Sequence, residues 1–201
     1  MKIAILGHTK GLGAELVKLL EPKHQIVGFA RSNGYDIDQP GTIQRIVNEV
    51  ADCDVFINSA KNPGGWPQVD MFSELLLAWE GKKKRIINIG SHVTVYNFTT
   101  IKPRFPTISA GHYTAWKQAL KTASYHAWQN SDWPMVTLVQ PGPFQGNVFH
   151  PMSDRDPPGV QRTVMTAEEV AKAIVSNTID SNVHILELTL RAIPYESKGV
   201  K

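Results

Sequence analysis

The sequence predicts an α/β fold with a single doubly wound parallel sheet. Short apolar runs typical of buried strands alternate with segments of helical periodicity throughout the 201 residues. Several of these runs end directly in glycine-rich or polar motifs. Ligands bind outside the carboxyl ends of the strands in open parallel sheets, so we expect these motifs to converge on one edge.

Composition favours one domain, which we place at residues 1–194, followed by a C-terminal tail at 195–201. A hydrophobic content of 42% is enough for one substantial core. Cys53 is the only cysteine, which excludes an intramolecular disulfide and a Cys-rich zinc site. The sequence has no signal-peptide core and no apolar run of about 20 residues, so we expect a cytoplasmic protein that does not insert into membranes.

A glycine-rich turn joins the first predicted strand, at 2–7, to a helix at 11–20. Glycines allow the backbone to approach a pyrophosphate, and the free amides at a helix N-terminus attract its charge. The alternative is an ordinary turn between strand and helix. We interpret the turn as a dinucleotide site made of Gly7, His8, Thr9, Lys10, Gly11, Leu12 and Gly13.

The second predicted strand, at 25–30, ends in Arg31 and Ser32 and has no acidic residue there. An acid at this position favours the ribose hydroxyl of NAD, whereas an arginine accommodates the 2′-phosphate of NADP. The sequence therefore predicts NADP (NADPH) as the cofactor, unless Arg31 is only a surface side chain. Residues 36–38 could form a very short third strand.

The remaining elements alternate in the same way. Thr166 and Glu169 form a capping box at the start of the last predicted helix. We expect loops over 61–69, after Ser91 and over 146–164. The periodicity predicts helices over 42–50, 69–80, 111–129 and 166–176, and strands over 54–58, 85–90, 134–139 and 184–190.

Tyr113 and Lys117 lie four residues apart in the predicted helix 111–129. Residues at this spacing share a helix face, so the phenol and the ammonium can point into one site. A nearby cation favours the phenolate and lowers the pKa of a tyrosine, which makes it a usable acid or base. Ser91 follows a predicted strand and should lie at the same edge of the sheet.

These motifs, in this order, resemble the short-chain dehydrogenase/reductase family over nearly the whole chain. The resemblance implies Tyr113 as the acid/base, Lys117 as the residue that binds the nicotinamide ribose and tunes the tyrosine, and Ser91 as the group that holds the substrate carbonyl. It also implies cofactor contacts from Asp36, Ile37, Asn58, Ser59, Ala60, Tyr113, Lys117, Pro141, Gly142 and Phe144.

The chain departs from the family pattern at two positions. We find no counterpart of the asparagine that often completes a catalytic tetrad. The threonine often found after the Pro-Gly turn is replaced by Gln145, Gly146 or Asn147.

The sequence therefore predicts an NADP(H)-dependent reductase or dehydrogenase acting on a small-molecule carbonyl or alcohol. The alternatives are a non-catalytic NADP-binding sensor or regulatory protein, and a compact member of the epimerase/dehydratase type. The resemblance also implies a homodimer through the predicted helix at 69–80 and the tyrosine helix. In the tyrosine helix the apolar residues at helical spacing are Trp116, Leu120, Ala123 and Ala127, with Trp128 beside them.

We expect neither a nucleic-acid partner nor a metal. The basic run at 82–85 has no interleaved aromatic residues, so it is typical of a solvated loop. His92 and His112 lie near the catalytic candidates but have no partners at metal-ligand spacing.

Overall fold

A computed structural model describes residues 1–60, 66–95, 107–130, 132–144 and 164–192. Gln145, Gly146 and Asn147, together with most of the predicted loops and the predicted tail, lie outside these segments. Within the segments, no helix is both long and apolar enough to cross a membrane.

Six parallel strands form one sheet in the order β2-β1-β3-β4-β5-β6. The central strands β1, β3, β4 and β5 are buried almost throughout, which explains their continuous apolar sequences. The strands are β1 (Lys2–Leu6), β2 (Gln25–Phe29), β3 (Val55–Asn58), β4 (Arg85–Ile89), β5 (Met135–Pro141) and β6 (Glu187–Leu190).

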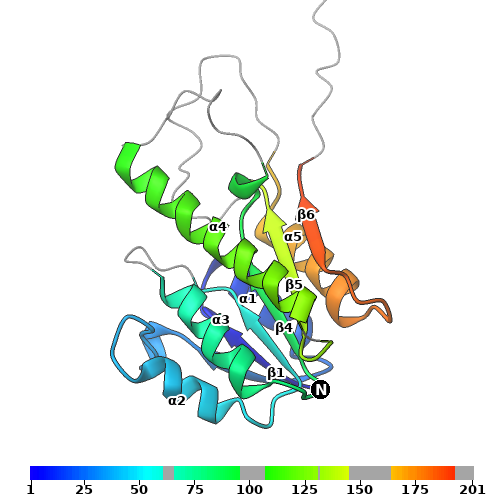
Figure 1. The fold of residues 1–201 in the computed structure, drawn as a ribbon. Helices are drawn as coiled ribbons and strands as arrows, with labels where there is room; N and C mark the ends of the chain where they lie inside the picture. Colours follow the sequence, from blue (N-terminus) through cyan, green and yellow to red (C-terminus); the bar gives the residue numbers. More distant parts are fainter. Residues whose placement is uncertain (61–65, 96–106, 131, 145–163, 193–201) are drawn as a thin grey trace, which may run out of the picture.

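Helices cover both faces of the sheet, as predicted (Figure 1). α1 and α5 share one apolar layer with one face, and α2, α3 and α4 form the layer on the other face. The helices are α1 (Gly11–Leu20), α2 (Thr42–Glu49), α3 (Pro67–Ala78), α4 (Thr107–Asn130) and α5 (Ala167–Ile174).

The largest differences from the predicted boundaries are at the starts of two elements. α4 begins at Thr107, four residues before the predicted start at Gly111. β6 begins at Glu187, three residues after the predicted start at His184. The capping box of α5 is present as predicted, because Thr166 accepts from the amide of Glu169 while the Glu169 carboxylate accepts from the amide of Thr166.

The predicted third strand at 36–38 does not form. Two parallel strands must be joined by a crossover of about a dozen residues or more, and only six separate Phe29 from Asp36. The segment turns instead, with the amide of Asp38 donating to Oδ1 of Asp36. β2 is therefore an edge strand of the sheet.

Candidate functional site

The predicted motifs meet at the carboxyl edge of the sheet. The register pairs Leu6 with both Phe29 and Asn58, Asn58 with Asn88, and Ile89 with Val139. The residues that follow these strand ends therefore lie side by side, which is the convergence that the sequence predicted.

The glycine-rich turn packs tightly at the end of β1. A side chain at Gly13 would place its Cβ 2.0 Å from the carbonyl oxygen of Gly7, and a Cβ at Gly7 would lie 3.0 Å from Cα of Ala60. Gly7 has φ 86°, and its amide donates to the carbonyl of Phe29 at 2.7 Å. Only glycine combines this backbone angle with such close approach.

The N-terminus of α1 suits an anion. Lys10 is the N-cap residue and makes no side-chain cap, and the first turn contains no acidic residue. The first amides of α1 therefore have no capping side chain and carry the positive end of the helix dipole. Thr9 and Lys10 are exposed, whereas Leu12 is buried in the core.

The turn after β2 holds Arg31 and Ser32 at the surface. Asn33 shapes this turn, because its Oδ1 accepts from the amide of Ala30 and its Nδ2 donates to the carbonyl of Gly28. β1 and β2 are neighbours, so Lys10 and Arg31 follow adjacent strand ends. Both cationic side chains are exposed, and each follows the carboxyl end of one of these two strands.

The other predicted residues after β2 differ in exposure. Asp36 is half-buried and its carboxylate is used within its own turn, where it accepts from the amide of Asp38 at 3.2 Å. Ile37 is buried among the core residues of the α2 and α3 layer.

The imidazole of His8 packs against β2 at Gly28. A Cβ built at Gly28 would lie 2.4 Å from Cδ2 of His8, so the strand needs glycine where the ring lies. Nδ1 of His8 is buried and has no hydrogen-bond partner among the described residues.

Asn58 links the end of β3 to its neighbours. It is fully buried, and its Nδ2 donates to the carbonyl of Gln68 at 2.9 Å and to Oδ1 of Asn88 at 3.1 Å. Asn88 in turn donates to Ser124 of α4 at 3.1 Å. Ser59 and Ala60 follow β3 and lie against the glycine-rich turn, where the amide of Ser59 donates to the carbonyl of Leu6.

Lys117 is buried, and its ammonium is held by two acceptors. Nζ donates to Oε1 of Gln68 at 2.7 Å and to the carbonyl of Ile89 at 2.8 Å. Nε2 of Gln68 donates to the carbonyls of Asn58 and Ile89. Because this amide end must face two carbonyls, the oxygen end of Gln68 must face Lys117.

Gln68 is a site residue that the sequence reasoning missed. The predicted helix began at Val69, whereas α3 begins at Pro67 and places Gln68 in its first turn. Proline is common at the first helical position, so the Pro67-Gln68 pair was the available signal. The sequence showed no counterpart of the asparagine that often completes a catalytic tetrad. The structure places the carboxamide of Gln68 beside Lys117.

Tyr113 and Ser91 are brought together as predicted. A side-chain hydrogen bond with Ser91 lowers the pKa of Tyr113, but burial has the larger effect and the net direction is upward. This direction is opposite to the lowering that we predicted from Lys117. The ammonium of Lys117 lies 5.8 Å from the centre of the Tyr113 ring, where Gln68 and Ile89 hold it.

The end of β5 closes the site on its far side. Pro141 and Gly142 are buried, and the amide of Gly142 donates to the carbonyl of Leu190 at 2.8 Å. A Cβ at Gly142 would lie 3.1 Å from that oxygen. Phe144 pairs with Met165 and packs on the α1 and α5 layer.

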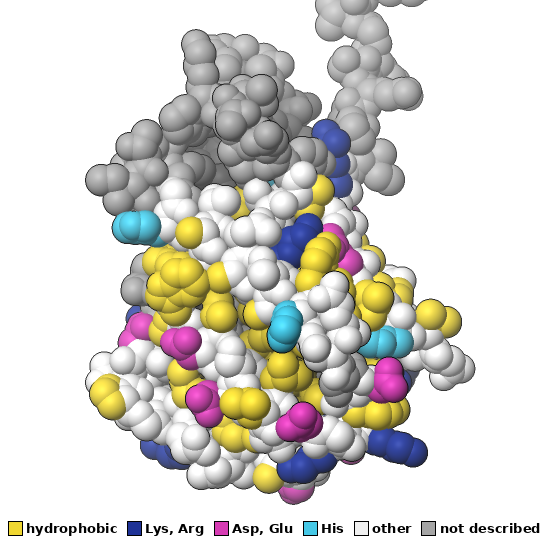
Figure 2. All heavy atoms as spheres, in the orientation of Figure 1, with side chains coloured by type: hydrophobic (Ala, Val, Ile, Leu, Met, Phe, Trp, Pro, Cys, Tyr) yellow, Lys and Arg dark blue, Asp and Glu magenta, His cyan; other side chains and the backbone are white. Residues whose placement is uncertain are grey.

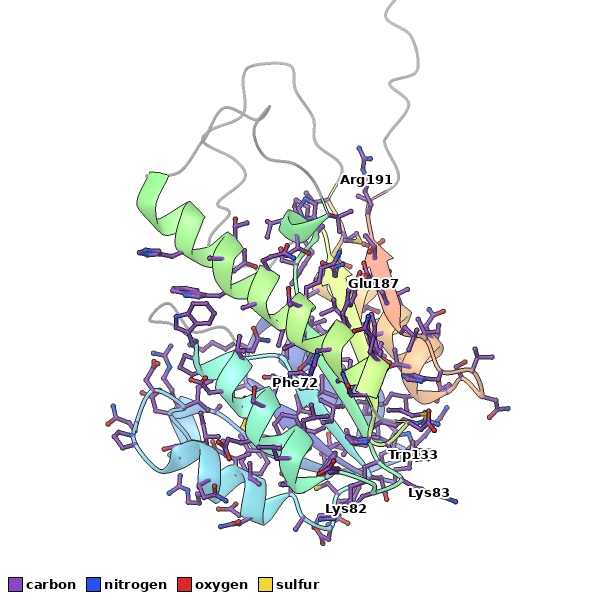
Figure 3. The ribbon with its side chains drawn as sticks, viewed as in Figure 1. Phe72, Lys82, Lys83, Trp133, Glu187 and Arg191 are labelled. Atoms are coloured by element: carbon purple, nitrogen blue, oxygen red, sulfur yellow. The ribbon has the colours of Figure 1, made fainter. Side chains whose placement is uncertain are left out.

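Three of the four basic side chains at 82–85 donate hydrogen bonds within the protein. Lys82 and Lys83 of this run are labelled in Figure 3. Lys82 donates to the carbonyl of Ala78 at the end of α3, and Lys84 donates to the carbonyls of Ala51 and Cys53. Arg85 donates to the carbonyl of Thr178. In the described segments, no group of three or more His, Cys, Asp or Glu side chains could hold a metal.

Comparison with solved structures identifies the fold. The chain is similar to a short-chain dehydrogenase/reductase from Vibrio parahaemolyticus, with 16% identity, a TM-score of 0.72 and coverage of 95% of this chain and 96% of that one. A short-chain dehydrogenase from Burkholderia cenocepacia in complex with NADP gives 17% identity, a TM-score of 0.70 and coverage of 95% and 88%. The chain is also similar to the 3-alpha-hydroxysteroid dehydrogenase from Pseudomonas sp. complexed with NADH. The identity is 20%, the TM-score is 0.63, and the match covers 94% of this chain and 95% of that one.

No family model and no curated protein matches the sequence. The similar solved structures nevertheless show that the protein has the fold of the short-chain dehydrogenases/reductases, the family that its motifs resemble.

Proposed function

We propose that this protein is an NADP(H)-dependent oxidoreductase that interconverts a carbonyl and an alcohol, with Tyr113 as the acid/base. The observation that carries the proposal is the meeting of Ser91, Tyr113 and Lys117 at the carboxyl edge of the sheet. These residues come from the end of β4 and from one face of α4, and Tyr113 is hydrogen-bonded to Ser91.

The residues at this edge fit a dinucleotide. The tight approach of Gly7 and Gly13 leaves backbone where a side chain would otherwise stand, and α1 presents uncapped amides toward an anion. Solved proteins of this fold hold NADP in one case and NADH in another, so the fold does not choose between them. The preference for NADP rests on Lys10 and Arg31, whose charges suit a 2′-phosphate.

The bound nicotinamide would supply or accept the hydride. Ser91 would donate a hydrogen bond to the substrate oxygen and stabilise negative charge that develops there. The Tyr113 hydroxyl would give its proton to that oxygen during reduction and remove it during oxidation. Lys117, positioned by Gln68, would keep a positive charge near the phenol, which opposes the effect of burial on its pKa.

The test is Tyr113→Phe, which removes the hydroxyl and keeps the ring. NADPH should still bind, as measured by fluorescence, while turnover of a carbonyl panel followed by NADPH absorbance should fall by roughly 10²–10⁴. Lys117→Ala should reduce both binding and turnover. A sensor would bind NADPH and show no turnover even unmutated, and full activity of Tyr113→Phe would refute the role of Tyr113.

A further inference from the structure

A chain of polar side chains runs from the Ser91 turn, across the end of β5, to β6 and α4. Ser91 begins the 3₁₀ turn His92–Thr94, in which its carbonyl accepts from the amide of Thr94 at 3.2 Å. Oγ1 of Thr94 lies 3.1 Å from the same carbonyl and also contacts Oε1 of Gln140. A hydroxyl has one proton to donate, and both the Gln140 oxygen and the Ser91 carbonyl are acceptors within its reach.

Gln140 is fully buried, so its carboxamide must find all its partners within the protein. Its Nε2 donates to Oε1 of Glu187 on β6 (labelled in Figure 3). A carboxylate only accepts hydrogen bonds, so the amide end must face Glu187 and the oxygen end must face Thr94. Glu187 therefore fixes the orientation of the Gln140 carboxamide, with its nitrogen toward β6 and its oxygen toward Thr94.

Glu187 is held in turn by α4. The hydroxyl of Tyr125 donates to its Oε2, and Nζ of Lys121 lies 3.8 Å from its Oε1. Thr189, next to it on the same face of β6, donates to Oε1 at 3.3 Å. Lys121 and Tyr125 follow Lys117 at intervals of four residues, so they lie along the helix face that carries the site.

We propose that Gln140 is a positioning residue, which holds the Ser91 turn in place relative to Tyr113 by joining Thr94 to Glu187 and so to α4. The two reacting side chains belong to separate elements, the turn after β4 and helix α4. The hydrogen bond between Ser91 and Tyr113 is one connection between the two elements, and the row of polar side chains through Gln140 is a second. This row includes no residue of the glycine-rich turn and none of the turn after β2. The consequence for turnover rests on the proposed function, whereas the positional role does not.

The main test compares Thr94→Val with Thr94→Ser. Valine keeps the branched shape of threonine but has no hydroxyl that could donate a hydrogen bond to Gln140. Serine keeps the hydroxyl. NMR titration of isotope-labelled tyrosine, with Tyr113→Phe to assign the signal, reads the pKa of Tyr113 without any turnover. Because the Ser91 hydrogen bond lowers this pKa, Thr94→Val should shift it upward and Thr94→Ser should leave it near the unmutated value.

Thr189→Val is the matched control, because it removes another hydroxyl from Glu187 without touching the Ser91 turn. It should leave the pKa of Tyr113 unchanged. Gln140→Met is the second variant, used where Thr94→Val does not fold, and it should also raise the pKa. An unchanged pKa of Tyr113 in a folded Thr94→Val or Gln140→Met protein would overturn the proposal, as would an equal shift in Thr189→Val.

Turnover gives the second measurement once a substrate is known. Thr94→Val should lower kcat by about 10- to 100-fold, the scale of a misplaced reacting group, with NADPH affinity unchanged. If the pKa shifts as expected and no carbonyl compound is turned over, the positional role stands and the proposed function fails. If turnover is present and the pKa does not move, the proposed function stands and the role of Gln140 fails.

Discussion

Oε1 of Gln68 accepts a 2.7 Å hydrogen bond from Nζ of Lys117, although the two residues are 49 positions apart. Both side chains are buried, and the carboxamide has one permitted orientation because its nitrogen serves two carbonyls. An ammonium out of water needs such acceptors, since an unpaired buried charge is costly. The position of Lys117 in the site therefore depends on α3 as well as on α4.

Gln68→Leu should lower both the stability and the NADPH affinity of the protein. The substitution removes one acceptor of the Lys117 ammonium and the Gln68 donor to the carbonyls of Asn58 and Ile89, and we expect the free energy of unfolding to fall by about 1–3 kcal/mol. Urea unfolding and fluorescence titration measure the two effects. Glu74→Gln, an exposed change on the same helix, is the control and should change neither. Wild-type NADPH affinity in folded Gln68→Leu would contradict the role.

Arg31→Ala should weaken NADP binding selectively, because it removes a charge-assisted contact with the 2′-phosphate. Such a contact is worth about 1.5–3 kcal/mol, or roughly 10- to 100-fold in Kd. Lys10→Ala should act in the same direction, and NAD binding should change little in Arg31→Ala. Lys23→Ala is the charge-matched control, because Lys23 is exposed just before the opposite end of β2. Equal affinities of the unmutated protein for NADP and NAD would refute the NADP preference.

Gly28→Ala should reduce NADPH binding through His8. The added methyl would lie 2.4 Å from the imidazole, which must then leave its place against β2. The ring belongs to the glycine-rich turn, so a displaced ring would enter the space that we assign to the cofactor. Truncating that ring as well, in the double variant His8→Ala with Gly28→Ala, should restore binding toward that of His8→Ala alone. Calorimetry can measure all three, and a double variant no better than Gly28→Ala would disprove this explanation.

The resemblance implies a homodimer through α3 and α4, and side-chain exposure narrows the surface that could form it. Leu120 and Ala127 of the predicted stripe are buried in the core, whereas Leu77 is 70% and Tyr125 is 37% exposed. Hydrophobic side chains are visible on this face in Figure 2. Leu77→Glu should convert a dimer into a monomer in light scattering, and it leaves the contact of Tyr125 with Glu187 intact. A monomeric mass of the unmutated protein at micromolar concentration would rule the dimer out.

Local patterns in the sequence determined most of the fold. Apolar runs, helical periodicity and the capping box of Thr166 predicted where the five α-helices and six strands of the described segments lie, because these signals act over a few residues. The spacing of Tyr113 and Lys117 placed both on one face of α4, and chain order alone placed the motifs after their strands. The false third strand came from the same local reasoning, which ignored the length that a parallel crossover needs.

Only the tertiary structure decided what surrounds these side chains. The pKa of Tyr113 moves upward because burial outweighs its hydrogen bond with Ser91, and burial depends on how α4 packs on the sheet. Gln68 reaches Lys117, and Gln140 reaches Thr94 and Glu187, because the register of the parallel strands brings distant segments to one edge. No spacing along the chain encodes such contacts, since they depend on which strands are neighbours and on the face to which each side chain points.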